Sequence, residues 1–86
     1  MKAFYHKDFK KAYQKLSPQL KEKANERILL CLEDPFNQIL NNHALAGRYL
    51  GYRSINITGD YRAIYKFINA DLILLTNLGT HSELYK

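Results

Sequence analysis

The stretch that decides the fold is YLGYRSINITGDYRAIYKFINADLILLTNL, residues 49–78. Apolar and polar residues alternate over 49–57 and again over 61–67, which is the period of a β-strand with one buried face. Short segments rich in Thr, Gly, Asn and Asp separate the runs, and Thr58–Gly59 predicts a tight turn. The last run, 72–78, is more continuously apolar and predicts a buried third strand. Together they predict an antiparallel meander.

Two amphipathic helices are predicted before the meander. The first has apolar residues at helical spacing, and Asp8 is expected to cap its N-terminus. The second starts after Ser17, the expected N-cap, with Pro18 at the first helical position. We expect it to end near Glu33, because Pro35 disfavours helical backbone in the residue before it. The apolar stripe of the first helix comprises Phe9, Ala12, Tyr13 and Leu16.

The remaining segments complete a single domain spanning residues 1–86. Residues 3–5 are expected to form a short first strand, and residues 34–48 a loop. The predicted order is therefore β-α-α-β-β-β. Helices followed by a run of strands predict an α+β fold, in which two N-terminal helices (a helical hairpin) pack on a small antiparallel sheet of three to four strands.

Composition restricts the classes of protein to which the chain can belong. Its 86 residues are 47% hydrophobic and 24% charged, which is typical of a globular domain. The net charge of +5 suits a polyanionic partner, either nucleic acid or an acidic protein. No apolar run approaches the roughly 20 residues of a membrane span, and the N-terminal segment lacks the apolar region of a secretory signal. We expect a cytoplasmic protein that does not bind membranes.

Common metal and cofactor signals are missing from the sequence. The histidines His6, His43 and His81 have no metal-ligand spacing, and there is no glycine-rich phosphate loop. Cys31 has no second cysteine with which to form a disulfide. Its position on the inner stripe of the second helix predicts a core residue rather than a nucleophile. We therefore expect neither a metal nor another cofactor.

Polar groups suited to phosphate chemistry gather in the C-terminal half. Histidine titrates near neutral pH and can give or take a proton, while the planar fork of arginine matches a phosphate. Such groups permit metal-free RNA cleavage by the ribose 2′-OH, although Asp60 is also common in turns and Arg62 could be an ordinary surface charge. The set is His43, Arg53, Asn56, Asp60, Arg62, His81 and Tyr85.

Three blocks of sequence resemble one family. LAGRYLGYR (45–53), DYRAIY (60–65) and GTHSELY (79–85), with the opening FYHKDFKKAYQKL (4–16), resemble the RelE/YafQ superfamily of bacterial type II toxins, and most closely its YafQ-like branch. The resemblance covers nearly the whole chain. It implies a RelE-like fold and a ribosome-dependent mRNA endoribonuclease, or mRNA interferase, which a cognate antitoxin neutralises.

The resemblance also suggests site residues. His81 would be the general acid, Asp60 and His43 the bases or orienting groups, and Tyr85 a group that stacks on a base or contacts the 2′-OH. Arg62 would stabilise charge on the phosphate. Asn56 stands where the YafQ branch has a histidine, and asparagine can position a phosphate but cannot transfer protons. The expected substrate-binding residues are Arg48, Arg53, Asn56, Tyr61 and Thr80.

Two alternative functions remain open from the sequence. One is a ParE-like toxin of the same fold that inhibits gyrase. The other, suggested by Asn56, is a catalytically weak module that binds RNA or the ribosome. For the favoured function, the expected partners are a cognate antitoxin and mRNA on the ribosome. The free toxin is expected to be a monomer that forms a hetero-oligomer with its antitoxin.

Overall fold

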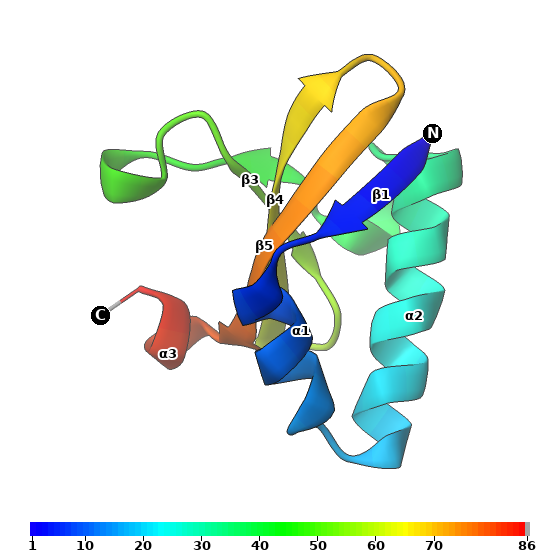
Figure 1. Cartoon of the computed structure of the whole chain (residues 1–86), viewed down its shortest axis with the longest axis vertical. Helices are drawn as coiled ribbons and strands as arrows, with labels where there is room; N and C mark the ends of the chain where they lie inside the picture. The colour runs from blue at the N-terminus through cyan, green and yellow to red at the C-terminus, as the bar shows by residue number, and fades with distance from the viewer. Residues whose placement is uncertain (86) are drawn as a thin grey trace.

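The chain folds around a five-stranded mixed sheet, which a computed structural model describes together with the rest of residues 1–85 (Figure 1). The strands are Lys2–Tyr5 (β1), His43–Ala44 (β2), Arg53–Asn56 (β3), Tyr61–Asn69 (β4) and Leu72–Thr80 (β5). They lie in the order β1-β5-β4-β3-β2. The predicted meander is confirmed, because β3, β4 and β5 pair antiparallel in sequence order.

The prediction of an antiparallel sheet of three to four strands was wrong in count and in direction. β1 pairs with β5 in parallel, with Lys2 opposite Leu72 and Tyr5 opposite Leu75. A short strand, β2, also forms within the segment predicted as a loop. Alternation in a sequence indicates an extended segment but does not say which strand it pairs with. Here β1 and its partner β5 are separated in the sequence by both helices and three other strands.

The two helices are α1 (Lys7–Gln14) and α2 (Pro18–Glu33). α2 starts and ends as predicted, and the Ser17 hydroxyl accepts a hydrogen bond from the Leu20 amide at 3.2 Å. The predicted cap of α1 was wrong by two residues. His6 Nδ1 accepts from the Asp8 amide at 3.1 Å, so His6 is the N-cap. Asp8 lies instead in the first turn, where a carboxylate favours the helix dipole.

The strand predicted over 49–57 was too long at its start. Residues 47–49 form a single 3₁₀ turn, η2, and the strand begins only at Arg53. Gly47 has φ +63° and Gly51 has φ +90°, in the left-handed region that glycine adopts without strain. These two glycines interrupt the alternation, so the chain projects from the sheet as a loop before β3 (Figure 1).

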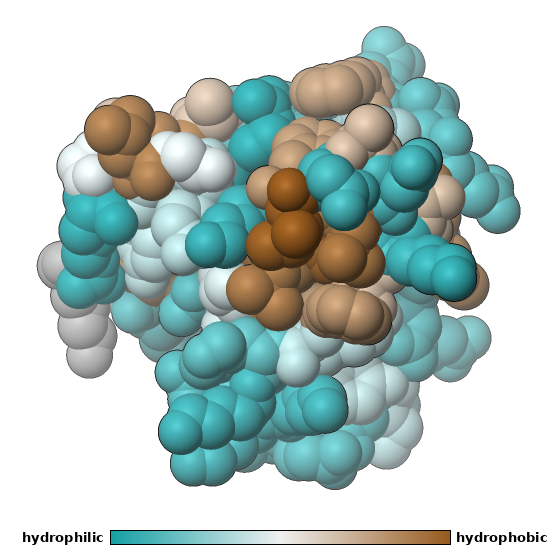
Figure 2. Space-filling view, turned by 45° about the horizontal axis from the view of Figure 1, so that its top comes forward, coloured by the Kyte–Doolittle hydropathy of each residue, from teal (hydrophilic) through white to brown (hydrophobic). Residues whose placement is uncertain are grey.

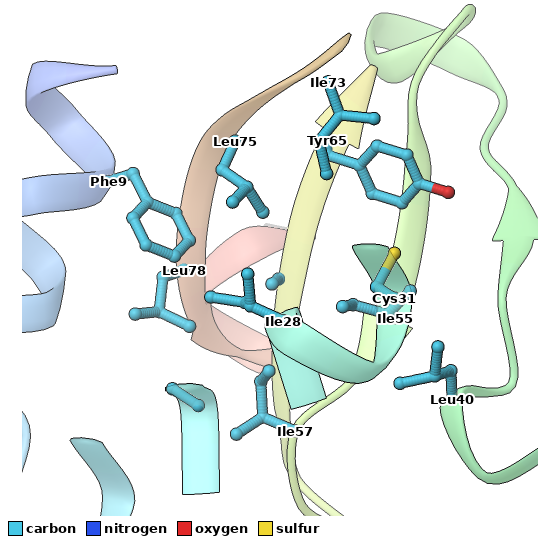
Figure 3. Close-up of a cluster of buried hydrophobic side chains, with 12 residues drawn as sticks. Phe9, Ile28, Cys31, Leu40, Ile55, Ile57, Tyr65, Ile73, Leu75 and Leu78 are labelled. Atoms are coloured by element: carbon cyan, nitrogen blue, oxygen red, sulfur yellow. The ribbon is translucent and has the colours of Figure 1, made fainter. Parts of the chain in front are cut away.

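The core lies between the helices and one face of the sheet (Figure 3). Phe9 from α1 and Ile28 from α2 pack against side chains of β3, β4 and β5. A β-bulge in the β4–β5 pairing lets both Leu75 and Leu78 reach this core, although they are three residues apart. The predicted core position of Cys31 is confirmed, since its side chain is fully buried.

Part of the surface is apolar. Figure 2 shows apolar side chains gathered where the β4–β5 hairpin comes toward the viewer, with hydrophilic side chains around them. Phe67 and Ile68, near the end of β4, are among the exposed large apolar residues. Contiguous exposed apolar surface on a small protein often marks an interaction site. Within residues 1–85, no helix is both long and apolar enough to cross a membrane.

The first prediction concerns the core. Ile55 is 0% exposed in β3, so Ile55→Ala should lower the free energy of unfolding by about 2–5 kcal/mol, because it leaves a cavity. The matched control is Ile68→Ala, at a strand position that is 48% exposed. Its cost should stay under about 1 kcal/mol. Urea denaturation of both variants measures the difference, and equal losses would contradict this description of the core.

Candidate functional site

A hollow of about 330 Å³ opens on the side of the sheet away from the helices. Its lining side chains come from separate segments: His43 from β2, Arg62 from β4, His81 from the short helix α3 (His81–Leu84), and Tyr85 just after it. Asn41 and Leu45 complete the lining. The fold thus brings together four of the five residues predicted as catalytic.

The position of His81 is set by the start of α3. The Thr80 hydroxyl accepts from the Glu83 amide at 3.2 Å, and the Glu83 carboxylate accepts from the Thr80 amide at 2.8 Å. These reciprocal bonds form a capping box. The His81 amide also donates to the carbonyl oxygen of Asp60 at 3.1 Å, which ties α3 to the β3–β4 turn. Leu84 is buried and anchors the helix.

Gly79 allows two elements to approach closely at the end of the sheet. It lies inside β5 opposite Arg62, and its φ is not in the left-handed region. A Cβ added at Gly79 would come within 3.2 Å of Glu83 Oε1 and 3.5 Å of Leu84 Cδ2. The glycine therefore allows α3 to pack closely against the end of β5.

Arg62 is held at the edge of the hollow by backbone oxygens. Its Nη1 donates to Gly59 O at 2.9 Å and to Thr58 O at 3.3 Å. Both bonds use the same nitrogen, so the guanidinium keeps other donors for an incoming acceptor. A phosphate oxygen is the acceptor that best fits a planar, permanently charged group.

Two buried oxygens lie close to this arginine in the fold. Asn56 is the cross-strand partner of Arg62, and its side-chain Oδ1 is buried. The hydroxyl of Tyr85, which lines the same hollow, is buried as well. Among residues 1–85, neither oxygen has a hydrogen-bond partner. Buried polar atoms usually have a hydrogen-bond partner, so the Tyr85 hydroxyl favours a polar ligand or water in the hollow. Asn56 does not itself line the hollow.

Aromatic rings continue from the hollow along the projecting loop. The ring of His81 lies 4.7 Å from that of Tyr85, and Tyr85 lies 5.9 Å from Tyr49. Arg48 lies over Tyr49 at 5.1 Å and donates to Leu84 O at 2.9 Å. Arg48 therefore braces the loop against α3, and it does not line the hollow.

The other predicted site residues lie outside the hollow. Asp60 is exposed at the β3–β4 turn and reaches His81 through its backbone oxygen rather than through its carboxylate. Tyr61 packs against the core on the helix side of the sheet. The Thr80 hydroxyl accepts a hydrogen bond from the Glu83 amide and so caps α3.

Arg53 also faces the helix side. Its Nε donates to Asn42 Oδ1 at 2.7 Å, and its guanidinium lies 5.2 Å from the ring of Phe36. These side chains form a partly buried cluster on the helix side, away from the hollow. Burial raises the pKa of Tyr65 to about 12, although a hydrogen bond from Asn42 opposes the shift. Burial also raises the pKa of Cys31, so neither group is ionised at neutral pH.

Sequence reasoning missed three contributors to the site. Asn41 and Leu45 line the hollow, and the Tyr49 ring contacts Tyr85 from a distant part of the chain. The pair Asn41–Asn42 before His43 was a usable signal, because asparagine is common where the backbone turns left-handed. Nothing in the sequence links Tyr49 to Tyr85. Within residues 1–85, no group of three or more His, Cys, Asp or Glu side chains could hold a metal ion.

Comparison with known protein families decides the assignment. Residues 1–86 match the family described as the bacterial toxin of type II toxin–antitoxin system, YafQ. The chain belongs to the YafQ toxin family. The predicted membership of the RelE/YafQ superfamily is thereby confirmed. A search of the curated proteins found no match.

Solved structures of related toxins share the fold. YafQ from Escherichia coli BL21(DE3) is 22% identical with a TM-score of 0.79, over 98% of this chain and 97% of that one. A YoeB/ParE toxin from Agrobacterium tumefaciens is 24% identical with a TM-score of 0.80, over 94% and 99% of the chains. The E. coli DinJ–YafQ toxin–antitoxin complex gives 25% identity and a TM-score of 0.71, over 98% and 96%.

The second prediction tests the cap that carries His81. Thr80→Ala should remove the hydroxyl that accepts from the Glu83 amide, at a cost of about 1 kcal/mol. α3 should then open more often, which hydrogen exchange at the Tyr85 amide would detect, because that amide bonds to His81 O. Thr80→Ser keeps the hydroxyl and is the matched control. Equal exchange in the two variants would mean that the cap does not hold α3.

Proposed function

We propose that this YafQ-family toxin is a ribosome-dependent mRNA endoribonuclease that works without a metal. The observation that carries the proposal is the hollow, where two histidines and an arginine from different elements face one space. Histidines can supply a general acid and a general base, and arginine can stabilise the negative charge of a phosphorane. The net charge of +5 suits an RNA substrate.

The proposed reaction is a transfer within the RNA chain. His43 takes the proton of a ribose 2′-OH, and the 2′ oxygen bonds to the adjacent phosphorus. The bond from phosphorus to the 5′ oxygen breaks, and His81 gives that oxygen a proton. Arg62 holds the charge on the non-bridging oxygens, and its partner Asn56 helps to orient them. The products are a 2′,3′-cyclic phosphate and a free 5′-OH.

The remaining predicted residues have supporting roles in this proposal. The Tyr85 ring lies against that of His81, tilted by 50°, and in this proposal contacts the ribose or a base. Asp60 orients α3 through its backbone oxygen, and Thr80 caps the same helix. Arg48 braces the loop. Arg53 and Tyr61 stabilise the scaffold instead of binding the substrate.

We also propose a cognate antitoxin as partner. The E. coli relative forms a DinJ–YafQ toxin–antitoxin complex, which supports the same kind of partner here. The basic chain favours an antitoxin with an acidic segment that covers the hollow. The apolar surface near the β4–β5 hairpin offers a second, uncharged contact (Figure 2). The free toxin is proposed to be a monomer.

The third prediction tests the general acid. His81→Ala should reduce transcript cleavage on the order of 10²- to 10⁴-fold and abolish growth arrest, because the leaving oxygen loses its proton donor. His81 is exposed, so the free energy of unfolding should change by about 0.5 kcal/mol or less. The measurements are the mapping of transcript 5′ ends after induction and a thermal melt.

The matched control is Ser82→Ala, at the next exposed position of α3. This variant should cleave as the wild type does. If His81→Ala melts normally but still arrests growth, a ParE-like inhibitor of gyrase becomes the better interpretation. If the wild type binds the ribosome but cleaves no transcript, a catalytically weak ribosome-binding module becomes the better interpretation.

The fourth prediction concerns metal. Side-chain acid and base catalysis needs no metal, so cleavage should be unchanged when EDTA removes divalent ions in excess of those that hold the ribosome together. The measurement is the cleavage rate on purified ribosomes at matched ribosome integrity. A rate that rises in proportion to added Mg²⁺, with ribosomes already intact, would contradict the metal-free mechanism.

A further inference from the structure

Asn41 has a left-handed backbone. Its φ is 46° and its ψ is 47°, and within residues 1–85 it is the only residue other than glycine with positive φ. It directly follows the 3₁₀ turn η1 (Gln38–Leu40) and precedes β2 by one residue. Left-handed backbone is unfavourable for most residues with a Cβ, and asparagine is among those that adopt it most readily.

The left-handed backbone of Asn41 places its carbonyl oxygen beside the His43 ring. Asn41 O lies 2.9 Å from His43 Nδ1. A carbonyl oxygen can only accept, so Nδ1 must carry the hydrogen. In neutral imidazole the other nitrogen, Nε2, then holds the lone pair. Within the described residues no group bonds to Nε2, and the side chain lines the hollow.

Asn42 ties the same segment to the protein interior. Its Nδ2 donates to Pro35 O at 2.7 Å and to the Tyr65 hydroxyl at 2.6 Å. Its Oδ1 accepts from Arg53 Nε at 2.7 Å. Tyr65 is fully buried in β4, so the amide is fixed by the core of the sheet. The backbone on either side of Asn42 is thereby held in place.

We propose that Asn41 and Asn42 are positioning residues that hold His43 as the Nδ1–H tautomer, with its basic Nε2 free for the substrate. Asn42 anchors the segment from the helix side of the sheet, and the Asn41 carbonyl orients the ring. The catalytic value of this arrangement rests on the proposed function, in which His43 is the general base. The tautomer itself can be measured without any activity.

The first experiment reads the tautomer directly. Long-range ¹H–¹⁵N spectra of the isotope-labelled toxin, at a pH about two units above the ordinary imidazole pKa of roughly 6.5, distinguish the two neutral forms. His43 should give the Nδ1–H pattern. His6 is an internal control that should show the other tautomer. Its Nδ1 accepts from the Asp8 amide, so in the neutral ring the hydrogen must be on Nε2. An Nε2–H pattern for His43 would overturn the proposal.

The second experiment changes the backbone preference at Asn41. Asn41→Gly can keep the left-handed conformation, whereas Asn41→Val strongly disfavours it. The glycine variant should keep the Nδ1–H pattern of His43, and the valine variant should show a mixture or the Nε2–H form. Transcript cleavage by the valine variant should fall on the order of 10²-fold below the glycine variant, because the base is misplaced.

Controls separate this proposal from the proposed function. Thermal melts of both variants identify any loss of the fold, and the His6 signal reports on an undisturbed histidine. Identical His43 spectra in two folded variants would overturn the role of Asn41. If the wild type shows the Nδ1–H form but cleaves no RNA, the tautomer assignment holds and the endoribonuclease proposal fails.

Discussion

The bulge in the β4–β5 ladder is the constraint on which the rest of the structure depends. Strict alternation would turn Leu78 away from the core that Leu75 enters, but the register shift returns it to the helix side. The Thr76 hydroxyl reinforces this point by donating to Ile64 O at 3.3 Å. Because the same shift sets the direction of the last residues of β5, it also sets where α3 and His81 emerge.

Backbone carbonyl groups hold the two histidines and the arginine of the hollow. Asp60 O fixes the start of α3, Gly59 O and Thr58 O hold the Arg62 guanidinium, and Asn41 O orients His43. Every residue carries a carbonyl, so the positioning depends on the path of the chain more than on the neighbouring side chains. Such a site can be retained while most of the sequence around it diverges.

Sequence patterns predicted those parts of the molecule that local chemistry determines. The limits of α2 follow from Ser17 and the segment before Pro35, and the meander follows from its alternation and turns. The pairing of strands far apart in the sequence could not be predicted, because no residue pattern within β1 indicates that it pairs in parallel with β5. The residues of the hollow were largely suggested by family resemblance. The placement of Arg53 on the helix side could not be predicted, because the sequence does not say which face of β3 the helices cover.

The pairing of β1 with β5 has a consequence for how the protein is made. Lys2 pairs with Leu72, so β1 has no strand to pair with until β5 has been synthesised. His81 and Tyr85 follow that strand in order of synthesis. Contacts so distant in sequence form slowly, because a long loop must close first. The β1 edge of the sheet and the hollow can therefore form only after β5 and α3 have been synthesised, whereas β2, β3 and β4 can pair earlier.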